Sequence, residues 1–484
     1  MEALYGPIDP LPPPPRAILP RFRAAARKSA KSSAAAAPPP LPVIPGADML
    51  LPGSPGYDEA LIASELREIV PPQIRAMCSA ESAVAAVVDW LREQGLPFAV
   101  RCGGHSYAGL SQSASVVVDV RRMNAIAVDQ AQRIVKVGAG AALGAIYRSL
   151  AGTGLGFAGG SCPTVGVAGH VLGGGMGLLG RAHGLACDNL LSLTMIDASG
   201  AKLVVDAANN SDLFWACRGG GGGSFGIATE FTFRLHPVPS VFTFGVTWTL
   251  PKAAAVALFD AWQGWGPTTL PEITALMKVQ GLRDGRIKLR CVGQSTGSEA
   301  TLRRELATLT AVADPDAPAG VKQRSFIEAV EYFAGSWEYQ SIYHKGMSDF
   351  VSDLSIAGIE ALLDQLIDTA AINLAALCDP YGGAIADLAP NATAFPFRGP
   401  KIYCIQYYLQ WSAASQTAAR LQACRAFYAA LRPFMRGGAY VNYCDTDLAD
   451  WATAYWGANL PRLRRIKAAR DPGNLFRHRQ SVAP

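Results

Sequence analysis

Glycine is concentrated in two segments of the chain that do not read as linkers. The first is Arg101-Cys102-Gly103-Gly104-His105-Ser106-Tyr107, which follows the short strand-like run Pro97 to Val100. The second covers residues 152–184, is strongly apolar, and contains Gly159-Gly160-Ser161-Cys162-Pro163-Thr164-Val165-Gly166-Val167-Ala168-Gly169. Glycine lets backbone amides approach a ligand closely because it has no Cβ. We therefore expect both loops to wrap closely round a ligand, with His105 and Cys162 as their candidate functional side chains.

Length and charge limit the classes of partner. The chain has 484 residues, 50% of them apolar, which is enough for a large core and two domains or more. No run of about eighteen apolar residues is present, so no membrane span is predicted. Residues 1–46 hold six basic and two acidic residues, which leaves a net charge near +1 on the rest. A nucleic-acid partner is therefore not supported.

Residues 1–49 are predicted to form a disordered, basic tail rich in proline and alanine. Residues 1–46 contain twelve of the 33 prolines, a composition that disfavours a packed core. The basic stretch Arg21 to Lys31 is not followed by an apolar segment, so no Sec signal peptide is expected. This pattern favours the cytoplasm, although compartment and oligomeric state stay open.

Cysteine and histidine do not indicate a disulfide framework or a metal site. The ten cysteines are scattered without a Cys-x-x-Cys pair, and most are expected to be buried thiols. The six histidines show no metal-ligand spacing.

Hydrophobic periodicity divides the chain into two α+β regions. From Ser79, apolar residues recur at helical spacing until Gly95, and strand-like runs follow at Val116–Val120, Ile134–Val137 and Leu190–Ile196. Pro237 and Pro239 mark a boundary. Beyond it, strands alternate with helices, which is typical of a second α+β domain. The strands are expected at Phe242–Leu250, Arg286–Gly293 and Ile402–Trp411, and the helices at Ala253–Trp265, Glu299–Val312, Ile359–Ile372 and Thr417–Leu431.

Two generic motifs match but lack the structural context that they require. Residues Gly175 to Gly180 fit the dinucleotide fingerprint, yet proline and glycine precede them and Gly184 interrupts the helix that should follow. Residues Gly222 to Gly226, with Ser224 at the centre, fit the nucleophile elbow of hydrolases. That elbow leads into a helix, whereas the alternating run from Ile227 to Leu235 predicts a strand.

The two candidate side chains each have an ordinary structural interpretation. A lone histidine is more often structural than a ligand, and most cysteines are inert packing. The turn around His105 also has the form of an anion-binding nest, in which backbone amides point inward at a pyrophosphate. Cys162 lies between glycines and Pro163, where core filling explains it less well. Covalent attachment would need a thiolate, which nearby amide dipoles are expected to favour.

Taken together, the motifs resemble the berberine bridge enzyme-like branch of the vanillyl-alcohol oxidase superfamily. The resemblance runs from about residue 50 to the C-terminus. The residues that carry it are Arg101–Ser106, Gly159–Gly169, Asp212-Leu213-Phe214-Trp215 with the glycines through Gly226, and Asn442-Tyr443-x-Asp445. His170 and the long proline-rich head depart from the family pattern.

The resemblance implies a covalently bound FAD. The loop histidine of the family holds the 8α carbon of the flavin and the loop cysteine holds C6, and His105 and Cys162 occupy those positions. The remaining cofactor-binding residues implied by the resemblance are Arg101, Gly103, Gly104, Ser106, Gly160, Val165, Gly166, Gly169, Gly226 and Ile227. Val165 stands where the family has an oxygen gatekeeper, and valine there favours oxygen reactivity over dehydrogenase behaviour.

The resemblance also implies the catalytic residues. In members that oxidise alcohols, the tyrosine at Tyr443 acts as general base above the flavin. A free tyrosine has a pKa of about 10 and is a poor base near neutrality, so the site must stabilise its phenolate. Tyr381 falls near the position of a second tyrosine in some members. A hydrogen-bonded core tyrosine is the structural alternative for Tyr443, and Asp445 would then only hold the loop. No equivalent of the glutamate base of the plant alkaloid cyclases is identifiable, which disfavours ring-closing chemistry.

We therefore predict an α+β flavoprotein of two domains. Residues 50–238, with 437–484 returning to them, form an FAD-binding domain of the p-cresol methylhydroxylase type, and residues 239–436 form an α+β substrate-binding domain with a large antiparallel sheet. The expected reaction transfers hydride from an alcohol carbon of an oligosaccharide or glycosylated natural product to flavin N5, and then to molecular oxygen, giving hydrogen peroxide. The alternatives are a dehydrogenase of the same fold with another electron acceptor, a flavin-binding protein without turnover, and a hydrolase using Ser224.

Overall fold

The computed structural model describes residues 40–484, so most of the predicted N-terminal tail lies outside the described residues. Residues 47–49 of that tail are not disordered. They belong to strand β1 (Ala47–Leu50), which pairs antiparallel with β2 (Ile74–Cys78). Ladder hydrogen bonds to a strand that is itself buried explain why this short segment is ordered.

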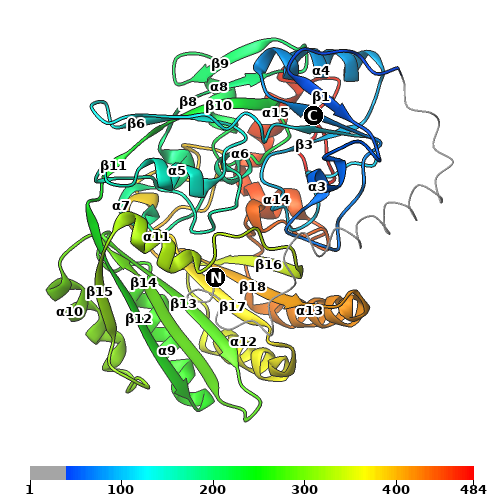
Figure 1. Ribbon diagram of the computed structural model, residues 1–484. Coiled ribbons are helices and arrows are strands. Elements are labelled where there is room, and N and C mark those ends of the chain that lie inside the picture. Colours follow the sequence, from blue (N-terminus) through cyan, green and yellow to red (C-terminus); the bar gives the residue numbers. More distant parts are fainter. Residues whose placement is uncertain (1–39) are drawn as a thin grey trace.

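Two sheets form the upper half of the molecule in Figure 1. In the first, β2, β4 and β3 run parallel and only β1 is antiparallel. Its order is β1, β2, β4 (Val116–Asp119) and β3 (Phe98–Arg101). The second sheet is antiparallel throughout. Its order is β5 (Ile126–Asp129), β6 (Ile134–Gly138), β10 (Ile227–Arg234), β8 (Leu190–Ile196) and β9 (Lys202–Asp206).

The helices of this half are mostly short. The helix predicted after Ser79 is present as α4. Its apolar residues at helical spacing are fully buried, namely Ala83, Val84, Val87, Val88 and Leu91. The helices are α3 (Tyr57–Leu61), α4 (Glu81–Glu93), α5 (Leu143–Ser149), α6 (Val167–Leu172), α7 (Gly180–His183), α8 (Ser211–Ala216), α14 (Trp451–Trp456) and α15 (Leu460–Arg470). A small two-stranded sheet joins β7 (Leu155–Gly156) to β11 (His236–Pro237).

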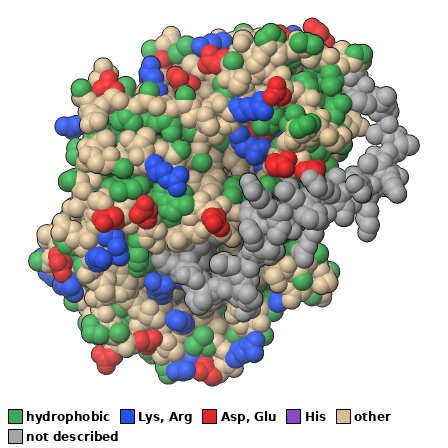
Figure 2. Space-filling model, viewed as in Figure 1, with side chains coloured by type: hydrophobic (Ala, Val, Ile, Leu, Met, Phe, Trp, Pro, Cys, Tyr) green, Lys and Arg blue, Asp and Glu red, His purple; other side chains and the backbone are tan. Residues whose placement is uncertain are grey.

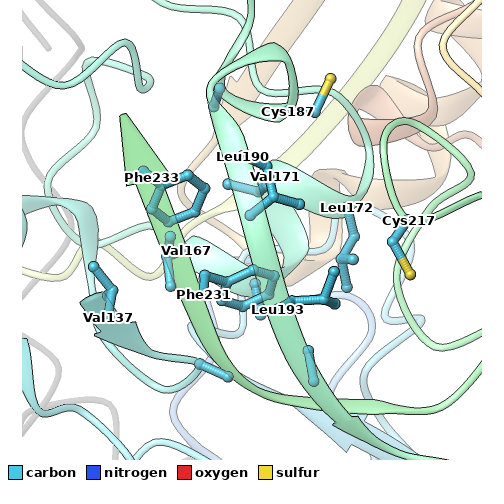
Figure 3. Packing of buried hydrophobic residues seen from close by; sticks show 14 of the residues in the cluster. Val137, Val167, Val171, Leu172, Cys187, Leu190, Leu193, Cys217, Phe231 and Phe233 are labelled. Carbon is cyan, nitrogen blue, oxygen red and sulfur yellow. The ribbon is translucent and has the colours of Figure 1, made fainter. Parts of the chain in front are cut away.

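Helix α6 follows the Cys162 loop directly and anchors it to the core. Val167, Val171 and Leu172 project from α6 toward the apolar faces of β8 and β10 (Figure 3). Phe231 and Phe233 of β10 are fully buried there. The loop before α6 is therefore held against a rigid sheet.

The lower half contains the large antiparallel sheet that the sequence predicts, with seven strands. Their order is β15 (Gly320–Ser325), β12 (Ser240–Leu250), β14 (Ile287–Ser295), β13 (Ile273–Gly281), β17 (Ala375–Pro380), β18 (Tyr403–Trp411) and β16 (Tyr343–Val351). The helices of this half are α9 (Lys252–Trp265), α10 (Glu299–Thr310), α11 (Phe326–Ala334), α12 (Ile356–Asp368) and α13 (Thr417–Leu431). All three predicted strands and all four predicted helices of this region are present.

The two faces of the seven-stranded sheet differ in character. On β13, Ala275, Met277 and Val279 belong to an apolar core that includes residues of α9 and α12. Side chains alternate between the faces of a strand, so Leu276 and Lys278 point to the opposite face. That second face looks toward the Cys162 loop, because Leu276 and Lys278 line one cavity with Ser161 and Gly177.

Surface and helix properties agree with an ordinary globular exterior. Basic and acidic side chains are interspersed over the face shown in Figure 2, which does not show a patch of one sign. Within residues 40–484, no helix has the length and hydropathy needed to span a bilayer.

Candidate active site

The two glycine loops pack directly against each other. A Cβ atom on Gly103 would lie 2.8 Å from the Cα atom of Gly166, and a Cβ on Gly166 would lie 2.9 Å from the Cα atom of Gly103. Neither distance is tolerated by real side chains. Glycine is therefore required at both positions for the loops to meet.

A cavity of about 360 Å³ extends from these loops toward the seven-stranded sheet. This volume is in the range of cofactor and small-molecule sites. Ten of the predicted site residues line it, namely Gly103, Gly104, His105, Ser106, Cys162, Val165, Gly166, Gly169, Gly226 and Tyr443. The glycine run Gly220 to Gly223 lines it as well, so much of the wall is backbone. Two reactive side chains and an extended glycine wall fit an FAD.

His105 is held in its neutral form. Burial, with a smaller contribution from the positive charge of Arg101, lowers the pKa of His105 to about 4. Its Nε2 atom lies 3.0 Å from the Thr164 hydroxyl, and its ring packs edge-on against Tyr339. A neutral imidazole keeps a lone pair, which is the form able to attack an electrophilic carbon.

Cys162 lies on the same cavity, but its environment does not favour a thiolate. Burial raises the pKa of the Cys162 thiol, and a hydrogen bond from Ser161 opposes this only in part. Burial therefore opposes the thiolate that nearby amide dipoles are expected to favour. The thiol proton has to leave as any bond to carbon forms.

Three predicted cofactor residues are close to the cavity without lining it. Arg101 is fully buried, and its guanidinium donates to the carbonyl of Ile62 beneath Gly104. Gly160 accepts a hydrogen bond from the Tyr147 hydroxyl at 2.7 Å. Ile227 is the first residue of β10 and is paired with β8. These residues shape the loops from behind.

His170, which departs from the family pattern, has a structural role. Its Nε2 atom accepts a hydrogen bond from the Gly160 amide at 3.0 Å. Burial lowers the pKa of His170 to about 4, which keeps this nitrogen free to accept. His170 therefore fixes the loop that carries Cys162.

Tyr443 reaches the cavity from the C-terminal segment and meets a buried carboxyl group. Its hydroxyl donates to Oδ2 of Asp379 at 3.2 Å, and its ring stacks on Tyr107 with centroids 5.8 Å apart. Burial raises the pKa of Asp379 to about 7, against the opposing effect of the Tyr443 hydrogen bond. A carboxyl group with this pKa exchanges protons near neutrality.

Tyr381 is not brought to this site. Its side chain is fully buried, and its ring stacks on Phe395 with centroids 5.8 Å apart. It lines none of the cavities found among the described residues that contain Tyr443. Because proline ends β17 just before it, Tyr381 turns into the aromatic cluster around Phe350 and Phe395.

Sequence reasoning missed several polar residues of the sheet that face the cavities. Asp379 of β17, and Gln406, Tyr408 and Gln410 of β18, all line them. Gln406 donates to the Tyr107 hydroxyl at 2.9 Å. The signal was a polar residue at every second position of an otherwise apolar strand, which marks one functional face.

The two rejected motifs have structural roles. The Ser224 side chain is buried, and its hydroxyl accepts a hydrogen bond from the amide of Val482. Gly226 leads into strand β10 and not into a helix, which excludes a nucleophile elbow. The helix after Gly180 has only four residues, which is too short for a dinucleotide-binding unit.

Comparison with known proteins identifies the family. Residues 72–206 match the model of an FAD binding domain, and residues 439–483 match the berberine and berberine-like model. The chain is 34% identical over 439 residues to the FAD-linked oxidoreductase YgaK of Bacillus subtilis, covering 89% of this chain and 95% of that protein.

Solved structures of similar proteins support the same family assignment. Physcomitrella patens BBE-like 1 superposes with a TM-score of 0.84 at 29% identity, covering 96% of this chain and 98% of that chain. A xylooligosaccharide oxidase from Myceliophthora thermophila gives 0.83 at 27% identity, covering 90% and 97%. The predicted fold class, a flavoprotein with an FAD-binding domain of the p-cresol methylhydroxylase type, is thus confirmed. The chain belongs to the berberine bridge enzyme-like family of FAD-linked oxidoreductases.

Proposed function

We propose that this protein is an oxidase whose FAD is attached through both His105 and Cys162. The observation that carries the proposal is that both side chains, 57 positions apart, line one cavity that also contains Tyr443. The neutral imidazole of His105 would replace a hydrogen on the 8α carbon of the flavin, and the Cys162 sulfur would replace the hydrogen on C6. Each substitution would release two protons and two electrons, which molecular oxygen would take up. Gly103 and Gly166 let the two loops approach closely enough to share one ring.

When bound, the flavin would supply a hydride acceptor at N5 and the electrons that convert oxygen to hydrogen peroxide. The protein supplies the base. Tyr443 takes the proton from the substrate hydroxyl, while its own proton passes along the existing hydrogen bond to Asp379. The near-neutral pKa of Asp379 makes this carboxylate a competent acceptor. This removes the need for a free phenolate.

The substrate is proposed to be an oligosaccharide or a glycosylated natural product with an oxidisable alcohol carbon. Two features support this class. The xylooligosaccharide oxidase shares the fold over 90% of this chain. Polar side chains of β18, Tyr408 and Gln410, line the cavity and can bind sugar hydroxyls.

Val165 also lines the cavity, where a small side chain would leave room for oxygen.

Acid precipitation tests the double attachment. In the purified wild type, the yellow colour and the flavin mass should remain with the precipitate. Each single variant, His105→Ala or Cys162→Ala, should keep the flavin through the other bond, and the double variant should release all of it. Cys424→Ala, a buried cysteine of α13 far from the loops in sequence, is the control. Complete release from the wild type would refute the proposal.

Oxygen reactivity is tested separately. Cellobiose and xylobiose should reduce the holoprotein, and air should reoxidise it with formation of peroxide. Val165→Leu should slow reoxidation by oxygen while leaving reduction by the sugar within about twofold. Reduction without peroxide would indicate a dehydrogenase instead.

A further inference from the structure

A second cavity lies on the sheet and has a strongly basic lining. Its volume is about 270 Å³. It is lined by Lys278, Lys288 and Arg290 together with Gly245, Thr247, Gln280, Gly320 and Tyr332. Among the described residues 40–484, eight line this cavity, of which three are cationic and none is acidic. We call this cavity the basic subsite.

The register of the sheet connects the basic subsite to Tyr443. Arg290 of β14 stands opposite Lys278 of β13, Lys278 opposite Leu377 of β17, and Leu377 opposite Gln406 of β18. Residues that stand opposite in an antiparallel sheet share a face. Gln406 donates to the Tyr107 hydroxyl, and Tyr107 stacks on Tyr443. One continuous row of side chains therefore leads from the basic subsite to the proposed base.

Lys278 lines both the basic subsite and a cavity next to the proposed base. That smaller cavity has a volume of about 80 Å³ and contains Asp379, Gln406 and Tyr443. From Gln406 to Arg290 there are three strand spacings, or roughly 14 Å between the backbones. A ligand that reached from the base to the basic subsite would have to be longer than one sugar ring.

Two cations of the basic subsite, Lys288 and Arg290, are poorly compensated within residues 40–484. Neither Lys288 nor Arg290 forms a side-chain hydrogen bond or ion pair with any residue in 40–484. Lys278 is only 7% exposed. Its burial, with repulsion from Arg290 and Lys288, lowers the pKa of Lys278 to about 7. Cations held together in this way are stabilised when an anion binds between them.

We propose that the basic subsite binds an anionic group of the substrate, a carboxylate or a phosphate carried by an acidic oligosaccharide, while the alcohol carbon lies at Tyr443. This inference rests on the proposed sugar-oxidase function and specifies its substrate class. Lys288 and Arg290 are then specificity residues that contact the anion, remote from the bond that is oxidised.

Binding to the holoprotein, measured by calorimetry, tests the basic subsite without requiring turnover. The probes are cellotriose and two derivatives that carry a carboxylate at C6, or a phosphate at O6, of the non-reducing sugar. One charge-assisted contact should make an acidic probe bind at least about tenfold more tightly than cellotriose. That preference should weaken with added sodium chloride. Whichever acidic probe binds more tightly, the carboxylate or the phosphate, identifies the anionic group that the subsite prefers.

The variants Lys288→Gln and Arg290→Gln, singly and together, should remove the preference. Arg303→Gln, which removes an exposed cation on α10, should keep it. Equal binding of all three probes, no binding of any, or an unchanged preference in the double variant would overturn the basic subsite.

Flavin reduction by the same probes separates the two proposals. If cellotriose reduces the flavin and the acidic probes bind no more tightly than cellotriose, the oxidase function is retained and the basic subsite is refuted. Tight acidic binding that depends on Lys288 and Arg290, with no reduction by any probe, retains the subsite and refutes sugar oxidation.

Discussion

At the scale of single residues, Tyr443 and Asp379 carry out the proposed proton transfer. Tyr443→Phe removes the hydroxyl that accepts the substrate proton and should slow flavin reduction by about 10²- to 10⁴-fold. Because Asp379 must be ionised to receive a proton and has a pKa of about 7, the wild-type reduction rate should fall as the pH drops below 7. Stopped-flow reduction measured from pH 5 to 9 checks both effects. An unchanged rate of flavin reduction in Tyr443→Phe would exclude Tyr443 as the base.

The same carboxyl group should cost stability. The pKa of Asp379 is raised from 3.8 to about 7 in the folded protein, so the folded state binds a proton more tightly than the unfolded chain. The stability that the protonated carboxyl group contributes is therefore complete below pH 4 and is lost as the pH rises through 7. Asp379→Asn should raise the free energy of unfolding at pH 8 by roughly 1–4 kcal/mol, and change it little at pH 4.

Urea unfolding at the two pH values measures this difference. Asp314→Asn, in the exposed loop after α10, is the matched control and should shift neither value. A loss of stability in Asp379→Asn at pH 8 would show that the charged form is better compensated than its burial implies.

The contact between the glycine loops can be tested at Gly103. Gly103→Ala places a methyl group against the backbone of Gly166, and overpacking of this kind costs roughly 1–3 kcal/mol. The loops should separate, so that less of the purified protein retains flavin. Gly264→Ala, in an exposed turn of α9 with open space around its Cα, should be neutral or slightly stabilising. Equal flavin content in both variants would argue against close contact of the loops.

At the scale of elements, α11 and the loop after it position the His105 loop. Ser325 and Glu328 form a capping box that fixes the start of α11. Past Gly335, the loop delivers Tyr339, whose hydroxyl lies 2.9 Å from the carbonyl of Gly103 and 3.0 Å from that of Gly104. An element of the substrate side therefore holds the backbone that carries His105.

Tyr339→Phe should lower the free energy of unfolding by about 1 kcal/mol through the lost hydrogen bond. It should also slow flavin attachment to His105, measured as the time course of acid-stable colour after flavin is added in the Cys162→Ala background. Tyr343→Phe is the control, because the Tyr343 hydroxyl makes no hydrogen bond within residues 40–484. Identical time courses in both variants would leave Tyr339 without a positioning role.

Elements with strong local patterns were predictable, and elements that depend on distant partners were not. Helix α4 and strand β10 follow from apolar periodicity alone. Strand β16 has the polar sequence Tyr-His-Lys-Gly-Met-Ser-Asp-Phe-Val, yet eight of its nine residues are buried. Its charges are matched by residues far along the chain, such as Arg432 for Asp349. No local pattern could reveal those partners.

The candidate site shows the same limit. The loops around His105 and Cys162 are recognisable because each is a contiguous motif. Asp379 is preceded by an apolar strand and carries no motif, so its role appears only when the fold brings it to Tyr443, 64 positions away. Tyr381 is the converse case, because it resembled a catalytic position in sequence but is turned into the aromatic core.

At the scale of the whole molecule, the C-terminal segment connects the two halves through the proposed active site. The carbonyl of Gly438 accepts a hydrogen bond from the amide of Phe350 in β16, and the indole of Trp456 donates to the carbonyl of Gly219, just before the glycine run. Tyr443 lies between these attachments. The position of the base therefore depends on contacts with both halves.

One buried cation secures this segment to the sheet. Lys345 of β16 is paired with Asp445 and with Asp447, the latter at 3.0 Å, and its side chain is only 5% exposed. Lys345→Met would leave Asp445 buried without its cation, a change that typically costs about 3–5 kcal/mol. Because Asp445 is two residues from Tyr443, the rate of flavin reduction should fall as well. Arg425→Gln removes the exposed partner of Asp447 and should cost less than about 1 kcal/mol. Denaturant unfolding and stopped-flow reduction of the two variants distinguish a structural anchor from a surface charge, and equal effects would show that Lys345 does not secure the segment.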